Sequence, residues 1–250
     1  AGPIPNRSDF LVTARGEIDF AAAARVLAAI VSESKDAQLA ELTGPIASQV
    51  FWTRDFFRDV LPAFGPSFAA AAWPGAATVP NAVVGVAFRE PTIAGVIPVS
   101  QVIEHSLRFL GVAAALDSYK PNHERWALEL RQAGPARIHY LSGPPAKKGL
   151  APGFAVHRGW LLAGTNPEAL AESLAALDGP VKNEPSGLHV DLVQVRRLVE
   201  RLPPASADDH KREVALMLLG VFDDFRATSK SADGRREHRL EWTVRQAARP

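Results

Sequence analysis

Residues 8–20 (SDFLVTARGEIDF) and residues 186–202 (SGLHVDLVQVRRLVERL) begin the two ends of the chain in the same way. Each stretch starts as a strand and leads into a helix whose apolar residues fall on one face. A second apolar-periodic helix and then two strands follow each of them, ending at Glu90 and at Gln246. The sequence therefore predicts a pseudo-repeat of strand–helix–helix–strand–strand modules at both ends.

The last predicted strand, in residues 235–246, indicates how the sheet is built. His238, Leu240, Trp242 and Val244 alternate with charged or polar residues. Such alternation is typical of an antiparallel sheet with one face in water. We therefore expect an α+β fold, with helices packed on a largely antiparallel sheet.

The same pattern predicts a single α+β domain over residues 8–247. It would comprise a first module at 8–90, a central helix–strands–helix section at 97–178 and a second module at 186–246. No long polar linker separates these sections. Whether the two end modules share one sheet is left open by the sequence.

The clearest helix signal lies in the central section. Asn166 and Pro167 suit the N-cap and the first helical position, and Leu170, Leu174 and Leu177 form an apolar stripe behind them. Just before this helix, a two-residue turn predicts a hairpin, because the Arg-Gly pair separates two short apolar runs.

The first module contains two predicted helices. Asp19 is a candidate N-cap of the first, and the second is expected over residues 46–64. The apolar residues expected to form the buried stripe of the first helix are Phe20, Ala23, Leu27, Ile30 and Val31.

Residues 60–88 carry no charged side chain, so the stretch is long enough to suggest a membrane span. Four prolines interrupt it, and a broken backbone facing lipid would leave polar groups unsatisfied. We instead expect two strands, 67–73 and 82–90, buried on both faces because their apolar runs do not alternate.

Composition excludes several classes of protein. The net charge is +1, which gives no long-range attraction for nucleic acid or for acidic membranes. There is no cysteine, which rules out disulfides, thiolate nucleophiles and cysteine-based metal sites. The sequence begins without an initiator methionine, and a removed signal peptide or a trimmed product would each explain this.

Motifs for catalysis are missing. The seven histidines show no metal-binding spacing, and an acid next to a histidine in sequence points away from it. Residues 143–149 (GPPAKKG) resemble a phosphate loop only superficially, since two prolines remove N–H donors. We expect no cofactor and no metal, and we lean against an enzyme without identifying catalytic residues.

One set of side chains predicts a contact surface. On the helix expected over residues 46–64, Phe51 falls on the flank away from the main apolar stripe, near Arg54 and Arg58. An outward aromatic residue beside two arginines is typical of protein contact surfaces. Coverage of this helix on two sides, by the sheet and by another helix, would also explain the pattern.

Three stretches resemble a bacterial, Ala/Leu-rich α+β family of unknown function, usually predicted to be exported or membrane-anchored. They are residues 64–72 (FGPSFAAAA) followed by 83–90, residues 154–177 (FAVHRGWLLAGTNPEALAESLAAL) and residues 218–244 (LLGVFDDFRATSKSADGRREHRLEWTV). The resemblance implies an extracytoplasmic location, periplasmic or at the cell surface, and no obvious enzyme site.

These observations favour a non-enzymatic, exported module that binds a protein, a peptide or an apolar ligand. Two alternatives stay open. One is a hydrolase-like enzyme whose site is assembled from residues distant in sequence. The other is a structural subunit of a larger assembly. The sequence does not identify a ligand or an oligomeric state.

Overall fold

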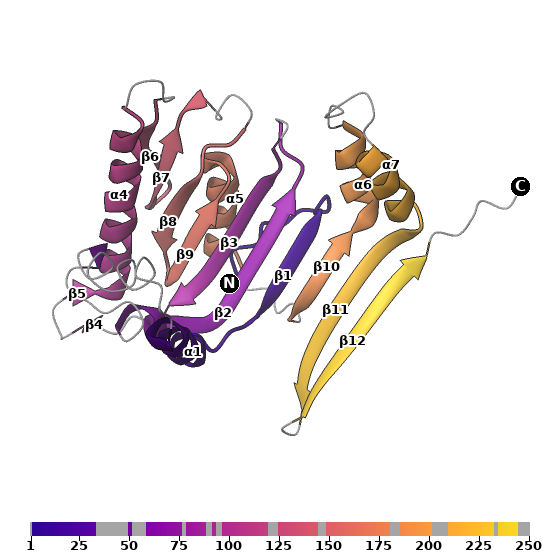
Figure 1. Ribbon diagram of the computed structural model, residues 1–250, viewed down its shortest axis with the longest axis horizontal. Coiled ribbons are helices and arrows are strands. Elements are labelled where there is room, and N and C mark those ends of the chain that lie inside the picture. Colours follow the sequence, from indigo (N-terminus) through magenta and orange to yellow (C-terminus); the bar gives the residue numbers. More distant parts are fainter. Residues whose placement is uncertain are drawn as a thin grey trace, which may run out of the picture.

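The computed structural model describes residues 2–33, 50–51, 59–76, 79–88, 92–93, 97–119, 125–144, 149–180, 186–201, 210–232 and 235–244. In these residues a ten-stranded sheet, antiparallel throughout, carries the fold (Figure 1). The prediction of an α+β fold with an antiparallel sheet is confirmed.

The spatial order of the strands is β12-β11-β10-β1-β2-β3-β9-β8-β7-β6. Their bounds are β1 Val12–Glu17, β2 Phe64–Trp73, β3 Asn81–Phe88, β6 Ala127–Ala133, β7 Ala136–Ser142, β8 Gly153–His157, β9 Trp160–Gly164, β10 Gly187–Asp191, β11 Phe222–Ala232 and β12 Arg235–Val244. Strands β1 and β10 pair directly, with Val12 opposite Val190, so strands from both ends of the chain belong to one sheet.

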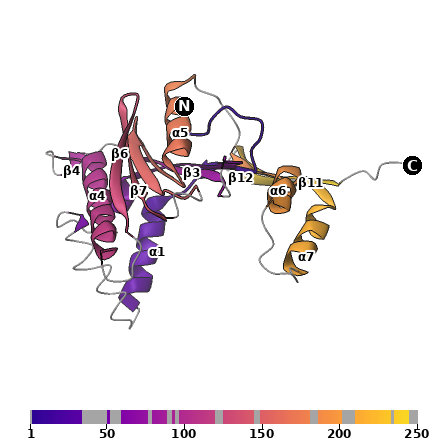
Figure 2. The same ribbon diagram turned by 90° about the horizontal axis from the view of Figure 1, so that it is seen from above.

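Helices lie on both sides of the sheet. The described helices are α1 (Phe20–Glu33), α4 (Val99–Asp117), α5 (Pro167–Asp178), α6 (Leu192–Arg201) and α7 (His210–Leu219), together with a short 3-10 turn η2 (Leu61–Ala63). A small separate ladder joins β4 (Thr92–Ile93) to β5 (Ile97–Pro98). Seen from above, α5 lies on one side of the sheet, and α1, α4 and α7 lie on the other (Figure 2).

The main core lies between α5 and the sheet. Leu170, Leu174 and Leu177 of α5 are at most 3% exposed and pack against residues that include Trp73 and Leu162, both 0% exposed. Asn166 caps this helix as predicted, because its side chain accepts a hydrogen bond from the N–H of Ala169 at 2.8 Å.

The predicted hairpin before α5 is also present. Its strands are β8 and β9, and the turn residues Arg158 and Gly159 have φ angles of 47° and 75°. Positive φ at both central residues defines a two-residue turn whose twist matches that of the strands. Glycine suits the second position because it has no Cβ to clash there.

Three predictions for the first module are wrong. The helix expected to reach Phe64 does not, because Phe64 already begins β2. The apolar stripe of α1 is not fully covered, since Leu27 is 43% and Ile30 is 55% exposed. Strands β2 and β3 are buried on one face rather than both: Val83 is 3% exposed, whereas Val84 is 51% exposed.

The burial of these strands differs from the prediction because α5 covers only one face of β2 and β3. Continuous apolar runs indicated two covered faces, but the second face is covered only in part: Phe88 is buried there, whereas Val84 is 51% exposed. A smaller core cluster lies on that second side, where Val60, Ala63 and Ile103 are buried and Leu161 of β9 packs against them.

Candidate functional site

The predicted contact residues are only partly described. Phe51 is half-buried and packs against the small cluster of Val60, Ala63 and Ile103. Arg54 and Arg58 lie outside the described residues. The structure therefore places Phe51 at the border of a core cluster and brings neither arginine to it within the described part of the chain.

A different surface stands out, on the side of the sheet that carries α1 and α4. The strand registers place one row of apolar side chains across seven neighbouring strands: Leu240, Ala227, Leu188, Ala14, Ala70, Val84 and Ala163. None of the seven is buried. We call this row and the apolar residues beside it on the same side the open face.

A second row supports the same description. Trp242, Phe225, Val190, Val12 and Ala72 lie opposite one another on successive strands, on the same side as the first row. Trp242 packs on the rings of Phe222 and Phe225, with centroid distances of 5.2 and 4.2 Å, and is still 55% exposed. The open face therefore reaches the edge strand β12.

The other side of the sheet has a different character. The corresponding row there runs Glu241, Arg226, His189, Thr13, Ala71, Val83 and Gly164. Its apolar members Ala71 and Val83 are buried beneath α5, and its polar members lie where α5 no longer covers the sheet. On this side the exposed residues are polar and the buried ones are apolar, as expected for a sheet with one face in water. On the open face, in contrast, the exposed residues are apolar.

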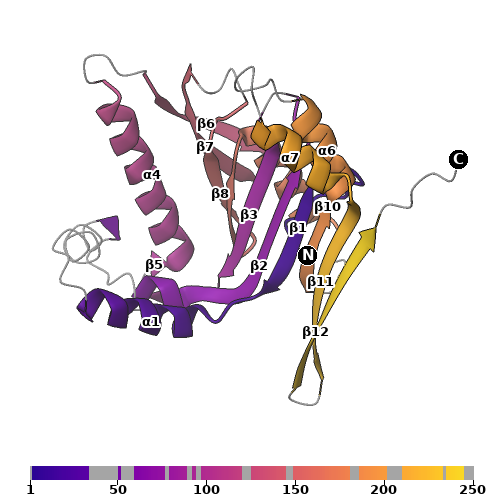
Figure 3. The same cartoon turned by 45° about the vertical axis from the view of Figure 1, so that its right-hand side comes forward.

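Helices flank the open face without covering all of it. In Figure 3, α4 lies to the left of β3 and α1 runs below the strands, whereas α6 and α7 lie to the right, toward β10 and β11. These helices also expose large apolar side chains, among them Val26 at 60%, Phe109 at 60% and Met217 at 67%. Apolar surface of this extent usually marks an interaction site.

The polar side of the sheet holds a second candidate site. Nε2 of His189 lies 2.6 Å from Oδ1 of Asp224, and Nε of Arg226 donates to Oδ2 of the same carboxylate at 2.8 Å. His189, Thr13 and Arg15 line a cavity of about 640 Å³ beside α5. The carboxylate orients the imidazole ring, which is what a catalytic histidine requires.

Arg7 also lines this cavity. Its guanidinium donates two hydrogen bonds to Asp9, at 2.8 and 2.9 Å, and one to Glu172 of α5 at 2.8 Å. These bonds favour the charged forms, so the pKa of Asp9 lies below its usual value and that of Arg7 above. Arg7 is therefore a fixed cation that ties the N-terminal segment to α5.

Other histidines find carboxylates that are distant in sequence. Nε2 of His139 lies 3.2 Å from Glu104, and Nε2 of His157 lies 3.0 Å from Asp178. The hydrogen bond from His157, with the charge of Arg158 nearby, lowers the pKa of Asp178. Sequence neighbours could not reveal these pairs, because each joins a strand to a helix.

Within the described residues, no group of three or more His, Cys, Asp or Glu side chains is placed to hold a metal ion. None of the described helices combines the length and the apolar character needed to cross a membrane.

The described chain is thus an antiparallel α+β sheet protein with one apolar, incompletely covered face. Comparison with known proteins adds no relative: no family model matches the chain, and no curated protein or solved structure matches it either.

Proposed function

We propose that the protein is a non-enzymatic binding module and that its open face takes an apolar ligand with an extended hydrocarbon chain. The observation that carries this proposal is the seven-strand row of apolar side chains, none of which is buried. Covering it would remove apolar surface from water, at about 25 cal/mol for each Å².

Side-chain chemistry favours a hydrocarbon over a polar ligand. The row from Leu240 to Ala163 contains no charged or hydrogen-bonding side chain. Four of its seven members are alanines, which leave the backbone of the sheet close to whatever lies on it. A long, unbranched hydrocarbon chain fits a surface of such small side chains better than a bulky polar molecule does.

Two further parts of the proposal concern origin and location. The order β1, α1, β2, β3 at one end and β10, α6, α7, β11, β12 at the other supports a duplicated module. An extracytoplasmic location is supported by the resemblance to exported proteins, and fractionation of cells that express the complete gene product tests it.

Fluorescence of cis-parinaric acid, a fatty acid that brightens in apolar surroundings, tests the ligand. We expect saturable binding to the protein and at least about tenfold weaker binding to Val84→Lys, because a charge would then stand in the middle of the open face. Thr228→Lys is the matched control, since position 228 lies on the other side of the sheet. Equal affinity in both variants, or no binding to the unmodified protein, would refute the proposal.

A second candidate function, a hydrolase-like enzyme, is favoured by the His189–Asp224 pair. The pair lies at a cavity that Thr13 also lines, so a histidine, a carboxylate and a hydroxyl-bearing residue gather there. Hydrolysis of p-nitrophenyl esters that disappears in His189→Gln would support this candidate. If His189→Gln hydrolyses the ester as fast as the control variant His105→Gln does, this candidate is excluded.

A further inference from the structure

Strand β12 lies at the end of the sheet and is long for an edge strand. It runs for ten residues, and every side chain described on it, from Glu237 to Val244, is exposed. Within the described part of the chain, only β11 pairs with it. Unpaired strand edges of this length bind other strands unless they are protected.

The apolar side chains of β12 are unusually exposed. Leu240 is 66%, Trp242 is 55% and Val244 is 57% exposed, and all three lie on the same side as the open face. The third strand of the first module, β3, pairs with β9 on its far side, whereas β12 has no described neighbour on its far side.

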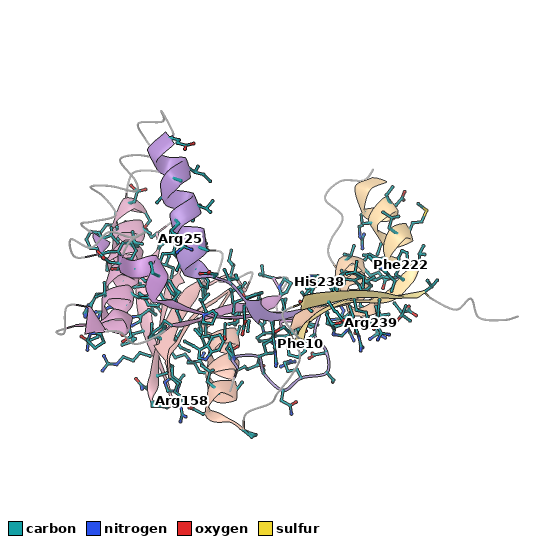
Figure 4. The ribbon with its side chains drawn as sticks, turned by 90° about the horizontal axis from the view of Figure 1, so that it is seen from below. Phe10, Arg25, Arg158, Phe222, His238 and Arg239 are labelled. Carbon is teal, nitrogen blue, oxygen red and sulfur yellow. The ribbon has the colours of Figure 1, made fainter. Side chains whose placement is uncertain are left out.

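The charged residues in the middle of β12, Glu237, Arg239 and Glu241, lie on its opposite side. Nε of Arg239 is 2.5 Å from Oε1 of Glu241, two positions further along the same strand. Figure 4 shows the two sides, with His238 toward α1 and α7 and Arg239 toward α5. The strand therefore presents an Arg-Leu-Glu triplet, with the two charges below the sheet and the leucine above it.

This triplet is complementary to itself in an antiparallel arrangement. When two copies of β12 pair about a two-fold axis at Leu240, Arg239 of each lies opposite Glu241 of the second copy. Leu240 then lies opposite Leu240, and Trp242 lies opposite His238. Opposite charges directly across an antiparallel pair stabilise it, and like charges destabilise it.

Other two-fold registers are poorer. Centring the pair on Arg239 or on Glu241 puts identical charges opposite each other. Centring it on Trp242 places Glu241 opposite Thr243 and forms no pair of opposite charges within the strand. A centre at His238 pairs Arg239 with Glu237 and Glu241 with Arg235, but it sets the central Leu240 opposite Arg236. The centre at Leu240 sets Arg236 opposite Val244, at the end of the strand, and it alone combines attractive charge pairs with a contact between the two leucines.

We infer that β12 is a dimer interface, at which the strand pairs antiparallel with β12 of a second copy about an axis at Leu240. The two sheets then form one continuous sheet, and the open faces of both copies adjoin. An interface of this kind is closed, because each copy contributes the same edge and no free β12 edge is left.

The other edge strand, β6, has a similar Glu-Leu-Arg triplet at residues 129–131, but its charges contact side chains of other elements, whereas Arg239 and Glu241 of β12 contact each other. The hydroxyl of Tyr140 donates to Glu129 at 2.5 Å, and Arg131 forms an ion pair with Glu168 at 2.7 Å. Pairing of β6 with β12 of another copy would also give an open fibre rather than a dimer. These two facts favour β12 with itself.

The absence of cysteine permits a direct test by single-cysteine crosslinking. We expect Leu240→Cys to form a disulfide-linked dimer under mild oxidation, because opposed residues in antiparallel strands approach within disulfide distance. His238→Cys and Trp242→Cys should crosslink poorly alone but well when mixed. Thr228→Cys on β11 is the matched control. Efficient crosslinking of Trp242→Cys alone would overturn the register.

Sedimentation equilibrium of charge variants tests the same pairing without cysteine. We expect a dimer that is weakened about tenfold or more by Arg239→Glu, since two attractive pairs become repulsive. The double exchange Arg239→Glu with Glu241→Arg should restore it. Circular dichroism checks that the variants fold.

A monomer at all concentrations, a dimer indifferent to Arg239→Glu, or mass that grows beyond the dimer would each overturn the inference. None of these outcomes bears on the fatty-acid test at Val84, so the two proposals fail separately.

Discussion

His139 of β7 and Glu104 of α4 connect the sheet to the helix that packs on it, with 3.2 Å between Nε2 and Oε1. The imidazole is also stacked on the ring of Phe154, with 5.1 Å between centroids. His139 is 5% exposed, and this burial is the main reason that its pKa lies below the usual value, although Glu104 opposes the effect.

The buried imidazole predicts that acid weakens the fold. The unfolded chain takes up a proton at position 139 as the pH falls below about 6.5, whereas the folded chain resists it. Stability should therefore be unaffected by this group above that pH and decline below it. We expect the urea midpoint to fall between pH 7.5 and 5.5, and to fall less in His139→Phe.

His105→Gln is the matched control for this prediction, because it changes an exposed histidine on α4, next to Glu104. It should keep the full dependence on pH. A fall of equal size in His139→Phe and in the unmodified protein would show that other groups cause the effect.

The hydrogen bonds of Arg7 to Asp9 and Glu172 predict that a substitution of Arg7 that keeps its charge still lowers stability. Arg7 holds both oxygens of Asp9 and one of Glu172, and its guanidinium lies 5.8 Å from the centre of the Trp73 ring. Lysine supplies a point charge without this planar fork, so Arg7→Lys should lower the free energy of unfolding by about 1 kcal/mol. Arg25→Lys on exposed α1 should change it little.

Acid should reduce the difference between Arg7→Lys and the unmodified protein. Arg7 lowers the pKa of Asp9, so this stabilisation is present above the usual pKa near 3.8 and is lost as the pH falls through the folded value. Thermal unfolding at neutral pH and below pH 3 checks this. An undiminished difference at low pH would show that packing on Trp73, rather than the ion pairs, is responsible.

Local signals in the sequence predicted several elements accurately. Asn166, Pro167 and the leucine stripe define α5, and the Arg158–Gly159 turn defines the hairpin before it, because these features act within a few residues. Asp19 likewise caps α1 as predicted, by accepting a hydrogen bond from the N–H of Ala22 at 2.9 Å. The antiparallel sheet followed from the alternation in β12.

Burial was predicted less well, because it depends on which element covers which face. The apolar run of β3 looks the same whether both faces are covered or one is, and only the position of α5 distinguishes Val83 from Val84. The His189–Asp224 pair was also invisible in the sequence, since β10 and β11 bring together residues 35 positions apart.

Replacing the N-cap residue of α5 should cause one of the larger losses of stability from a single substitution. Asn166 is buried, accepts from Ala169, and donates to Oδ1 of Asn81 at 2.8 Å. Asn166→Ala should lower the free energy of unfolding by about 2–3 kcal/mol, since it removes a cap and leaves buried groups without partners. Asn166→Ser keeps an acceptor at the cap and should lose about half as much.

The N-cap of α1 is the matched control, because it is exposed where Asn166 is buried. Asp19 also accepts from a backbone N–H in the first turn, that of Ala22 at 2.9 Å, but it is exposed. Asp19→Ala should therefore lower stability by about 1 kcal/mol or less. Equal losses at Asn166 and Asp19, measured by urea unfolding, would contradict the role assigned to burial.

The two sides of the sheet predict opposite responses to the loss of apolar side chains. Leu170 of α5 is 0% exposed within the main core, and Leu170→Ala should cost about 2–5 kcal/mol because it leaves a cavity. Val84 of β3 is 51% exposed, so Val84→Ala should cost less than about 1 kcal/mol. Urea unfolding of both variants measures the difference. A loss at Val84 as large as that at Leu170 would mean that the row of apolar residues is packed in solution, and the open face would no longer be a surface for a ligand.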